Sequence, residues 1–198
     1  AGRHARLAGV GPRRDGDLQP PPIAIRWDRP LLYAAITPPA GPPLHIVNLH
    51  LRAPRPAPVP TARGVGSSRA LIEGQFVAAL KREGQALEAR LFAETIFDAE
   101  PEALLAICGD FNADAHDAPT RLLRGGRDEG EEAPRRFSVI HAGRPTLLDH
   151  ILVSKNLAAA WRATEILNEG LQDEVYAPDP IDGSLHAPVV AIFTLATD

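Results

Sequence analysis

The sequence predicts a mixed α/β sandwich in which strands are buried between layers. Two hydrophobic patterns support this prediction. Short apolar runs of strand length occur, such as "ALLAIC" at residues 103–108, and residues 72–99 carry apolar side chains at helical spacing. At 198 residues the chain is long enough for a full core, and it contains no internal repeat. We therefore expect one α/β domain.

The N-terminal part changes character at Ile23. Residues 1–22 contain several arginines and a proline run but no apolar periodicity, so we expect an irregular segment there. Three short aliphatic runs follow, "IAIRW", "LLYAAITP" and "LHIVNLHL", and turn residues separate them. Such runs are typical of an antiparallel meander. We therefore predict that the folded domain occupies residues 23–198.

The longest periodic segment predicts a helix from Ile72 to Ala99, which Pro101 would end. Phe76, Leu80, Leu87 and Leu91 recur at helical spacing, and we expect the helix to cover one face of a sheet through Leu80, Leu87 and Leu91. The next run, "ALLAICGDFN", is continuously apolar through Cys108, as in strands that are covered on both faces. A short helix is expected at "DAPTRLL", with Asp117 as its N-cap. Further strands are expected at "TLLDHILVS", "WRATEILN" and "APVVAIFTL".

Polar side chains interrupt or end these apolar strands. They are Asn48, His50, Asp110, Asn112, Asp149 and His186. A buried carboxylate such as Asp149 is costly unless it is paired or hydrogen-bonded. Strand ends are also where α/β proteins gather their functional side chains. We therefore expect these residues to surround one cleft, although each of them alone is also explained by a local hydrogen bond.

The segments "NLHL", "GDFN", "LDHILVS" and "SLHAPV", in this order, resemble the C-terminal portion of the endonuclease/exonuclease/phosphatase superfamily. The resemblance runs from about Ile23 to the C-terminus. It implies part of a four-layer α/β sandwich with mixed, mainly antiparallel sheets, as in pancreatic deoxyribonuclease. It also implies hydrolysis of a phosphate ester that depends on magnesium or manganese, with water as the nucleophile.

The resemblance assigns a role to each residue in the central motifs. His186 would be the general base that activates the water, and Asp149 would orient its ring. Asp110 and Asn112 would contact the metal ion, the water or the phosphate. Magnesium and manganese bind to oxygen ligands of this kind.

The resemblance further implies that His50 donates to a phosphate oxygen or assists the leaving group, and that Asn48 supports the site. Leu185 stands where the family has an aspartate that helps to bind metal, and no glutamate precedes Glu73. The family's metal-binding glutamate lies on an early strand. We therefore expect the N-terminal strands of the fold to be missing and metal binding to be weakened. Asp182 is a candidate substitute for the lost carboxylate.

Three hypotheses follow from these residues. The first is a phosphodiesterase, nuclease or phosphatase whose remaining half is not in this sequence. The second is a degenerate, catalytically weak binding or scaffold module of the same fold. The third is a structural or interaction domain whose polar strand residues form only local hydrogen bonds. We favour the first.

The composition of the chain narrows the range of substrates and partners that we expect. The net charge of −4 provides no general basic surface for nucleic acid, and an aromatic content of 5% provides no stacking platform for bases. We therefore expect a small phosphoester rather than nucleic acid as the substrate. No run of 18 apolar residues and no secretory signal occur, so we expect a cytoplasmic protein without a membrane partner. The abundance of Ala, Arg and Pro is typical of a high-GC bacterium.

Overall fold

The computed structural model describes residues 6–7, 23–24, 26–58, 67–126, 136–178 and 183–195. Its strands are β1 (Arg6–Leu7), β2 (Ile23–Ala24), β3 (Leu32–Ile36), β4 (Leu44–His50), β5 (Leu104–Asp110), β6 (Val139–His141), β7 (Arg144–Thr146), β8 (Asp149–Val153), β9 (Trp161–Ile166) and β10 (Val189–Phe193). Its helices are α1 (Ser68–Ala99), α2 (Ala118–Arg124) and α3 (Lys155–Ala159). Mixed sheets and few helices confirm the predicted α/β class.

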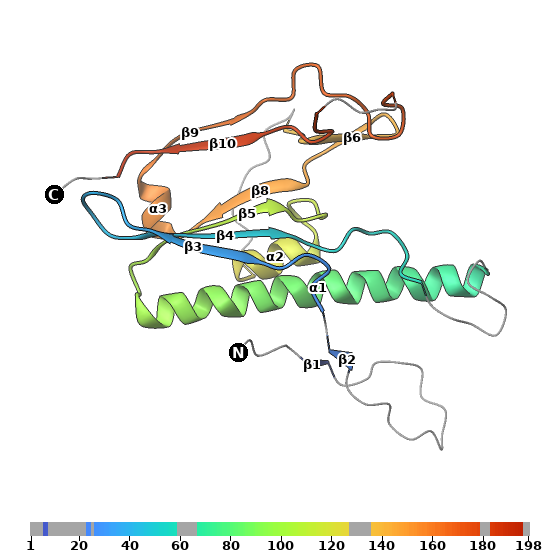
Figure 1. The fold of residues 1–198 in the computed structure, drawn as a ribbon, viewed down its shortest axis with the longest axis horizontal. Coiled ribbons are helices and arrows are strands. Elements are labelled where there is room, and N and C mark those ends of the chain that lie inside the picture. The colour runs from blue at the N-terminus through green and yellow to red at the C-terminus, as the bar shows by residue number, and fades with distance from the viewer. Residues whose placement is uncertain are drawn as a thin grey trace.

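The central sheet has four strands in the order β3-β4-β5-β8. The strands β4 and β5 are parallel and α1 connects them, whereas the other two pairs are antiparallel. Figure 1 shows α1 and α2 on one side of this sheet and the antiparallel pair β9–β10 on the other. The molecule is therefore layered, with β5 in the middle layer.

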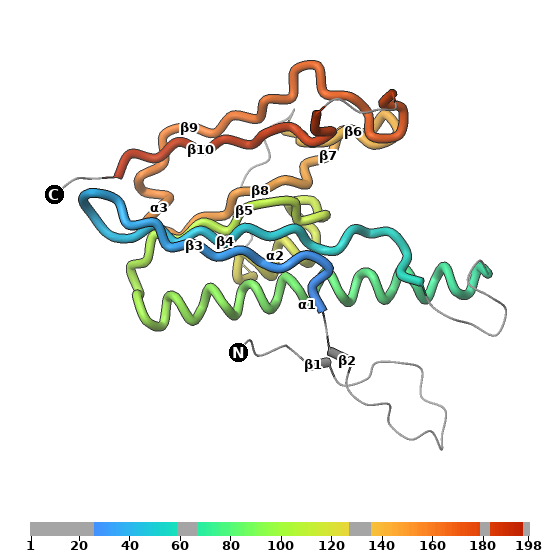
Figure 2. Tube along the Cα trace, viewed as in Figure 1, coloured from blue at the N-terminus to red at the C-terminus, as the bar shows by residue number. Residues whose placement is uncertain are grey.

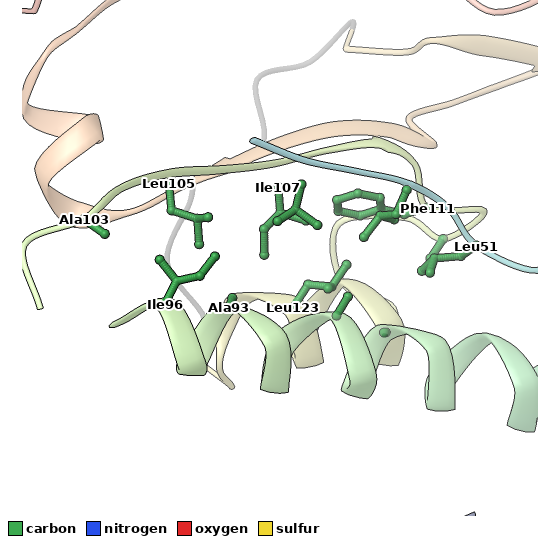
Figure 3. Close-up of a cluster of buried hydrophobic side chains, with 13 residues drawn as sticks. Leu51, Ala93, Ile96, Ala103, Leu105, Ile107, Phe111 and Leu123 are labelled. Carbon is green, nitrogen blue, oxygen red and sulfur yellow. The ribbon is translucent and has the colours of Figure 1, made fainter. Parts of the chain in front are cut away.

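The main core lies between the central sheet and the helices. Leu105, Ile107 and Phe111 point from the sheet side toward Ala93 and Ile96 on α1 (Figure 3). A smaller cluster on the opposite face consists of three buried residues, Leu104, Ala106 and Leu157. Burial on both faces explains why the sequence of β5 is continuously apolar, as predicted.

The helix α1 begins four residues before the predicted start, at Ser68 instead of Ile72. Ser67 caps it, because its Oγ accepts a hydrogen bond from the backbone N–H of Ala70 at 3.2 Å. The predicted sheet-facing side is wrong. Two of its three residues are exposed, Leu87 at 36% and Leu91 at 51%, while Leu80 is partly buried. Phe76, at the same spacing, is 50% exposed.

Small residues form the buried side of α1 instead. They are mainly alanines and glycines: Ala70, Gly74, Ala78, Gly84, Ala86, Ala89 and Ala93. A Cβ atom added to Gly74 would lie 2.3 Å from the carbonyl oxygen of Ala57, so a larger residue does not fit there. The helix packs closely because its contact side is nearly flat, which explains why the leucines point away.

The expected three-stranded meander is only partly correct. The strands β3 and β4 pair antiparallel as predicted, but β2, from the run "IAIRW", pairs with β1 instead of joining them. Trp27 at the end of this run donates a 2.6 Å hydrogen bond from Nε1 to Glu88 on α1, so the run contacts the helix layer. The strand β1 also lies within the segment expected to be irregular. The rest of residues 1–22 lies outside the described residues.

Candidate active site

Three of the candidate residues form one row across the central sheet. His50 in β4 is aligned with Asp110 in β5, and Asp110 is aligned with Asp149 in β8. Aligned residues in neighbouring strands present their side chains on the same face of a sheet. The row lies where β4 and β5 end and β8 begins, so the backbone leaves the sheet beside it.

The backbone around Asp110 is tightly constrained. Gly109 has a φ of 128°, and a Cβ atom there would lie 2.0 Å from the carbonyl oxygen of Leu49. Only glycine allows this approach of β5 to β4. Asn112 has a φ of 48°, and its backbone N–H donates to Oδ1 of Asp110 at 2.8 Å. Its side-chain Nδ2 donates to Oδ2 of the same carboxylate at 3.3 Å. Asn112 therefore holds the Asp110 carboxylate in place.

His186 reaches the row from the turn before β10. Its Nδ1 donates to Oδ2 of Asp149 at 2.7 Å, which confirms the predicted contact between these two side chains. The backbone N–H of His186 donates to Oγ of Ser184 at 3.0 Å, and the N–H of Ala187 donates to the carbonyl of Ser138 at 2.7 Å. These bonds fix the turn that carries the imidazole.

Ser138 forms hydrogen bonds both with the start of β8, which carries Asp149, and with the turn that carries His186. Its fully buried Oγ accepts from the backbone N–H groups of Leu148 and Asp149 at 3.1 and 3.0 Å. Its backbone carbonyl accepts from Ala187, next to His186. One residue thus sets the backbone on either side of the Asp149–His186 pair.

Burial and charge shift the pKa values of the site in different directions. The hydrogen bond to Asp149 raises the pKa of His186 to about 9, and the charge of Asp110 contributes to the shift. Burial raises the pKa of Asp110 and lowers the pKa of His50. The Nε2 atom of His50 lies 3.3 Å from Oδ2 of Asp110, which partly opposes both shifts. In the metal-free protein the imidazole of His186 is thus protonated at neutral pH.

A cavity of about 410 Å³ adjoins the pair. Asn48, Cys108, Asp149 and His186 are among the residues that line it. Asn48 is exposed, and its Nδ2 contacts Sγ of Cys108 at 3.7 Å. Of the residues that do not line this cavity, Asp110 lies next to Asp149 in the row, and His50 and Asn112 both contact Asp110. All six predicted residues therefore gather at one end of the central sheet.

The residues present fit a divalent cation in part. Ligand atoms of Asp110, Asp149 and His186 lie within 4.8 Å of one another, and no other such group occurs among the residues that the structure describes. Two carboxylates suit a hard cation such as magnesium or manganese. The predicted ligand Asn112 directs its amide N–H groups toward Asp110 and toward the carbonyl of Leu51. Leu185 is partly buried next to His186, and Asp182 lies outside the described residues.

Glu174 is a site residue that the sequence did not reveal. Its Oε1 lies 3.4 Å from Nε2 of His186, and its Oε2 accepts from Nδ1 of His141 at 3.0 Å. It belongs to the connection between β9 and β10, which Figure 2 shows beside β6. No spacing or motif marks Glu174, because its partners come from distant parts of the chain.

Three solved structures are similar to this chain, and each match covers 81–83% of its residues. They are beta toxin from Staphylococcus aureus (16% identity, TM-score 0.48), the 3′ phosphatase NExo from Neisseria bound to a product DNA hairpin (17%, 0.46) and sphingomyelinase C from Streptomyces griseocarneus (16%, 0.44). The chain spans 57%, 65% and 56% of their respective lengths. No curated protein matches the chain.

The family comparison is more extensive. A model described as the Endonuclease/Exonuclease/phosphatase family matches residues 10–181. This match includes the "NLHL", "GDFN" and "LDHILVS" segments that position His50, Asp110 and Asp149 in one row. The chain therefore belongs to the endonuclease/exonuclease/phosphatase family.

Proposed function

We propose that this chain hydrolyses a phosphate ester by means of a divalent metal ion and a water molecule that His186 activates. One observation carries the proposal. His186 donates to Asp149 at 2.7 Å, and Asp149 lies beside Asp110 in the neighbouring strand. A histidine oriented by a carboxylate, next to a second carboxylate, provides a base and a cation ligand in one place.

In the proposed reaction, Nε2 of His186 accepts a proton from the attacking water. Asp149 holds Nδ1 and thereby fixes the orientation and tautomer of the ring. His50 donates to a phosphate oxygen or to the leaving group. Since the pKa of His186 is about 9 without metal, hydrolysis should increase as the pH rises toward that value.

The metal ion would be held mainly by Asp110, with Asp149 close enough to contribute. When bound, magnesium or manganese neutralises charge on the phosphate and lowers the pKa of a bound water. Asn112 keeps the carboxylate of Asp110 oriented toward this position, and Asn48 supports the adjoining cleft.

We propose a small phosphoester as the substrate, in preference to nucleic acid. The negative net charge and the low aromatic content support this choice. We further propose a bacterial protein that acts in the cytoplasm. Among the described residues, no helix has the length and apolar character needed to cross a membrane.

The proposal is tested by incubating the chain with a chromogenic phosphodiester, a chromogenic phosphomonoester and plasmid DNA, each with magnesium or manganese. We expect hydrolysis of a small ester that a chelator abolishes and added metal restores. Cleavage of plasmid DNA alone would contradict the preference for a small substrate. Hydrolysis that persists in the chelator would contradict the metal-dependent reaction.

Two observations favour the alternative of a catalytically weak binding or scaffold module. Leu185 stands where the family resemblance implies a carboxylate next to His186, and Nε2 of His186 already contacts Glu174. A protein that binds the phosphodiester with metal but converts none of it, over a range of pH, would support this alternative.

A further inference from the structure

The carboxylate of Glu174 lies beside the ring nitrogen of His186 with which a bound ligand would form a hydrogen bond. Asp149 takes Nδ1, so Nε2 is the remaining hydrogen-bonding atom of the ring. Oε1 of Glu174 lies 3.4 Å from this atom. No water molecule fits between two atoms at that distance. A ligand oxygen that accepts from Nε2 therefore competes with this carboxylate for the same N–H.

The position of Glu174 is set by its backbone rather than by a chance side-chain contact. Its N–H donates to the carbonyl of Ile140 in β6 at 2.9 Å. The preceding residue, Asp173, accepts hydrogen bonds from the backbone N–H groups of Ala142 and Gly143 in the β6–β7 turn. These bonds attach the β9–β10 connection to the hairpin β6–β7, as Figure 2 shows.

The side chain is also held at its far end. Oε2 of Glu174 accepts from Nδ1 of His141, so the carboxylate bridges two histidines. The side chain of Glu174 is 30% exposed and that of His186 is 27% exposed, so their contact is partly shielded from solvent. A partly buried contact between charged groups is stronger than one at the open surface.

From this geometry we propose that Glu174 is a positioning residue that competes with the phosphate of the substrate for Nε2 of His186. A carboxylate oxygen and a phosphate oxygen are both anionic acceptors, and one N–H group can donate fully to only one of them. Glu174 thereby lowers the affinity of the site for phosphate and selects ligands that bind strongly enough to replace it. The inference rests on the proposed function, because that function makes a phosphate ester the ligand. It concerns His186 while Nε2 still carries a proton, before this atom can accept a proton from the attacking water.

The test compares inorganic phosphate binding in four forms of the full chain, in the presence of magnesium. These forms are the wild type, Glu174→Gln, Glu174→Asp and the control Glu169→Gln. Glu169 is exposed on the same connection, so its replacement changes the charge equally. The shorter side chain in Glu174→Asp keeps the charge but loses reach to Nε2. Calorimetry gives the affinity, and the ¹⁵N chemical shifts of the His186 ring report the contact directly.

We expect Glu174→Gln and Glu174→Asp to bind phosphate about two- to fivefold more tightly, the range that corresponds to a partly exposed ion pair. The Nε2 signal of His186 should shift in both variants before phosphate is added, and Glu169→Gln should match the wild type. Equal affinities in all four forms, or no phosphate binding at all, would overturn the inference. If phosphate binding changes as expected but no ester is hydrolysed, the proposed function fails and the competition stands.

Discussion

The two ring nitrogens of His186 face two different carboxylates, Asp149 at 2.7 Å and Glu174 at 3.4 Å. The contact with Asp149 is the stronger one and accounts for most of the rise in the pKa of His186 to about 9. A free histidine has a pKa of 6.5. With a pKa of about 9, the imidazole of His186 must lose a proton before it can act as the base in the proposed reaction.

The raised pKa of His186 predicts how stability depends on pH. Because the pKa is higher in the folded protein, the pairing stabilises the fold fully below pH 6.5 and is lost as the pH rises through about 9. Asp149→Asn should remove most of this dependence. Urea unfolding of both forms at pH 6 and pH 9.5, with a chelator present, measures it. A parallel loss of stability in wild type and variant would show that the pair does not cause the slope.

The position of Leu185 leads to a prediction about metal affinity when a carboxylate is introduced there. Leu185 is partly buried and precedes His186 in the chain, so Leu185→Asp adds a hard oxygen donor next to His186 in sequence. We expect tighter manganese binding in a calorimetric titration. Leu167→Asp, at a leucine that is 49% exposed on the β9–β10 connection, is the matched control. If Leu185→Asp and wild type bind manganese equally, Leu185 does not face the site.

At the scale of elements, the strands could be predicted from the sequence more accurately than the helix orientation. The strand β5 was recognised because burial on both faces requires a continuous apolar run. The helix α1 was recognised by its period, but the leucines were assigned to the wrong side. Hydrophobicity ranks leucine above alanine, whereas the close approach at Gly74 depends on size, which periodicity does not report.

The candidate site, too, could be predicted only in part from the sequence. His50, Asp110, Asp149 and His186 could be found from the sequence because each interrupts or ends an apolar strand. Glu174 could not, because it lies in a polar connection like many surface segments. Its place is set by a backbone bond to β6, a short strand that the sequence analysis does not predict.

The buried side of α1 predicts opposite outcomes for two neighbouring substitutions. Ala93 is fully buried against the sheet, so Ala93→Leu should destabilise the protein by about 1–3 kcal/mol through overpacking. Leu91 is 51% exposed, so Leu91→Ala should change stability by no more than about 0.5 kcal/mol. Urea unfolding at neutral pH measures both. The reverse order would place the leucines against the sheet after all.

The close approach of β4 and β5 predicts that Gly109→Ala is strongly destabilising. Its φ of 128° disfavours any side chain, and an added Cβ atom would lie 2.0 Å from the carbonyl oxygen of Leu49. Gly170→Ala is the control, since Gly170 has a φ of 74° but open space around it, and should cost only about 1–3 kcal/mol of backbone strain. Thermal unfolding should rank wild type, Gly170→Ala and Gly109→Ala in that order. Equal losses of stability in the two variants would show that backbone strain alone explains both, without a contribution from the close contact with Leu49.

At the scale of the whole molecule, the two faces of the central sheet are packed differently. The helix side has the large core of Figure 3, whereas the side toward β9–β10 has only a small buried cluster. A cavity of about 840 Å³ separates β8 from β9–β10, and Ile151, Val153 and Trp161 are among its lining residues. His186 precedes β10, so the geometry of the candidate site depends on how firmly this second sheet is held.

We propose that the Asp149–His186 pair and Asp110 act together as a metal-dependent hydrolytic site. The most direct measurement is the rate of chromogenic phosphodiester hydrolysis with manganese, across pH 6–10, for wild type and His186→Gln. We predict manganese-dependent hydrolysis by the wild type and a rate about 10²- to 10⁴-fold lower in His186→Gln, the share that a general base supplies. Equal rates in the two forms would contradict the claim, as would hydrolysis that does not require manganese.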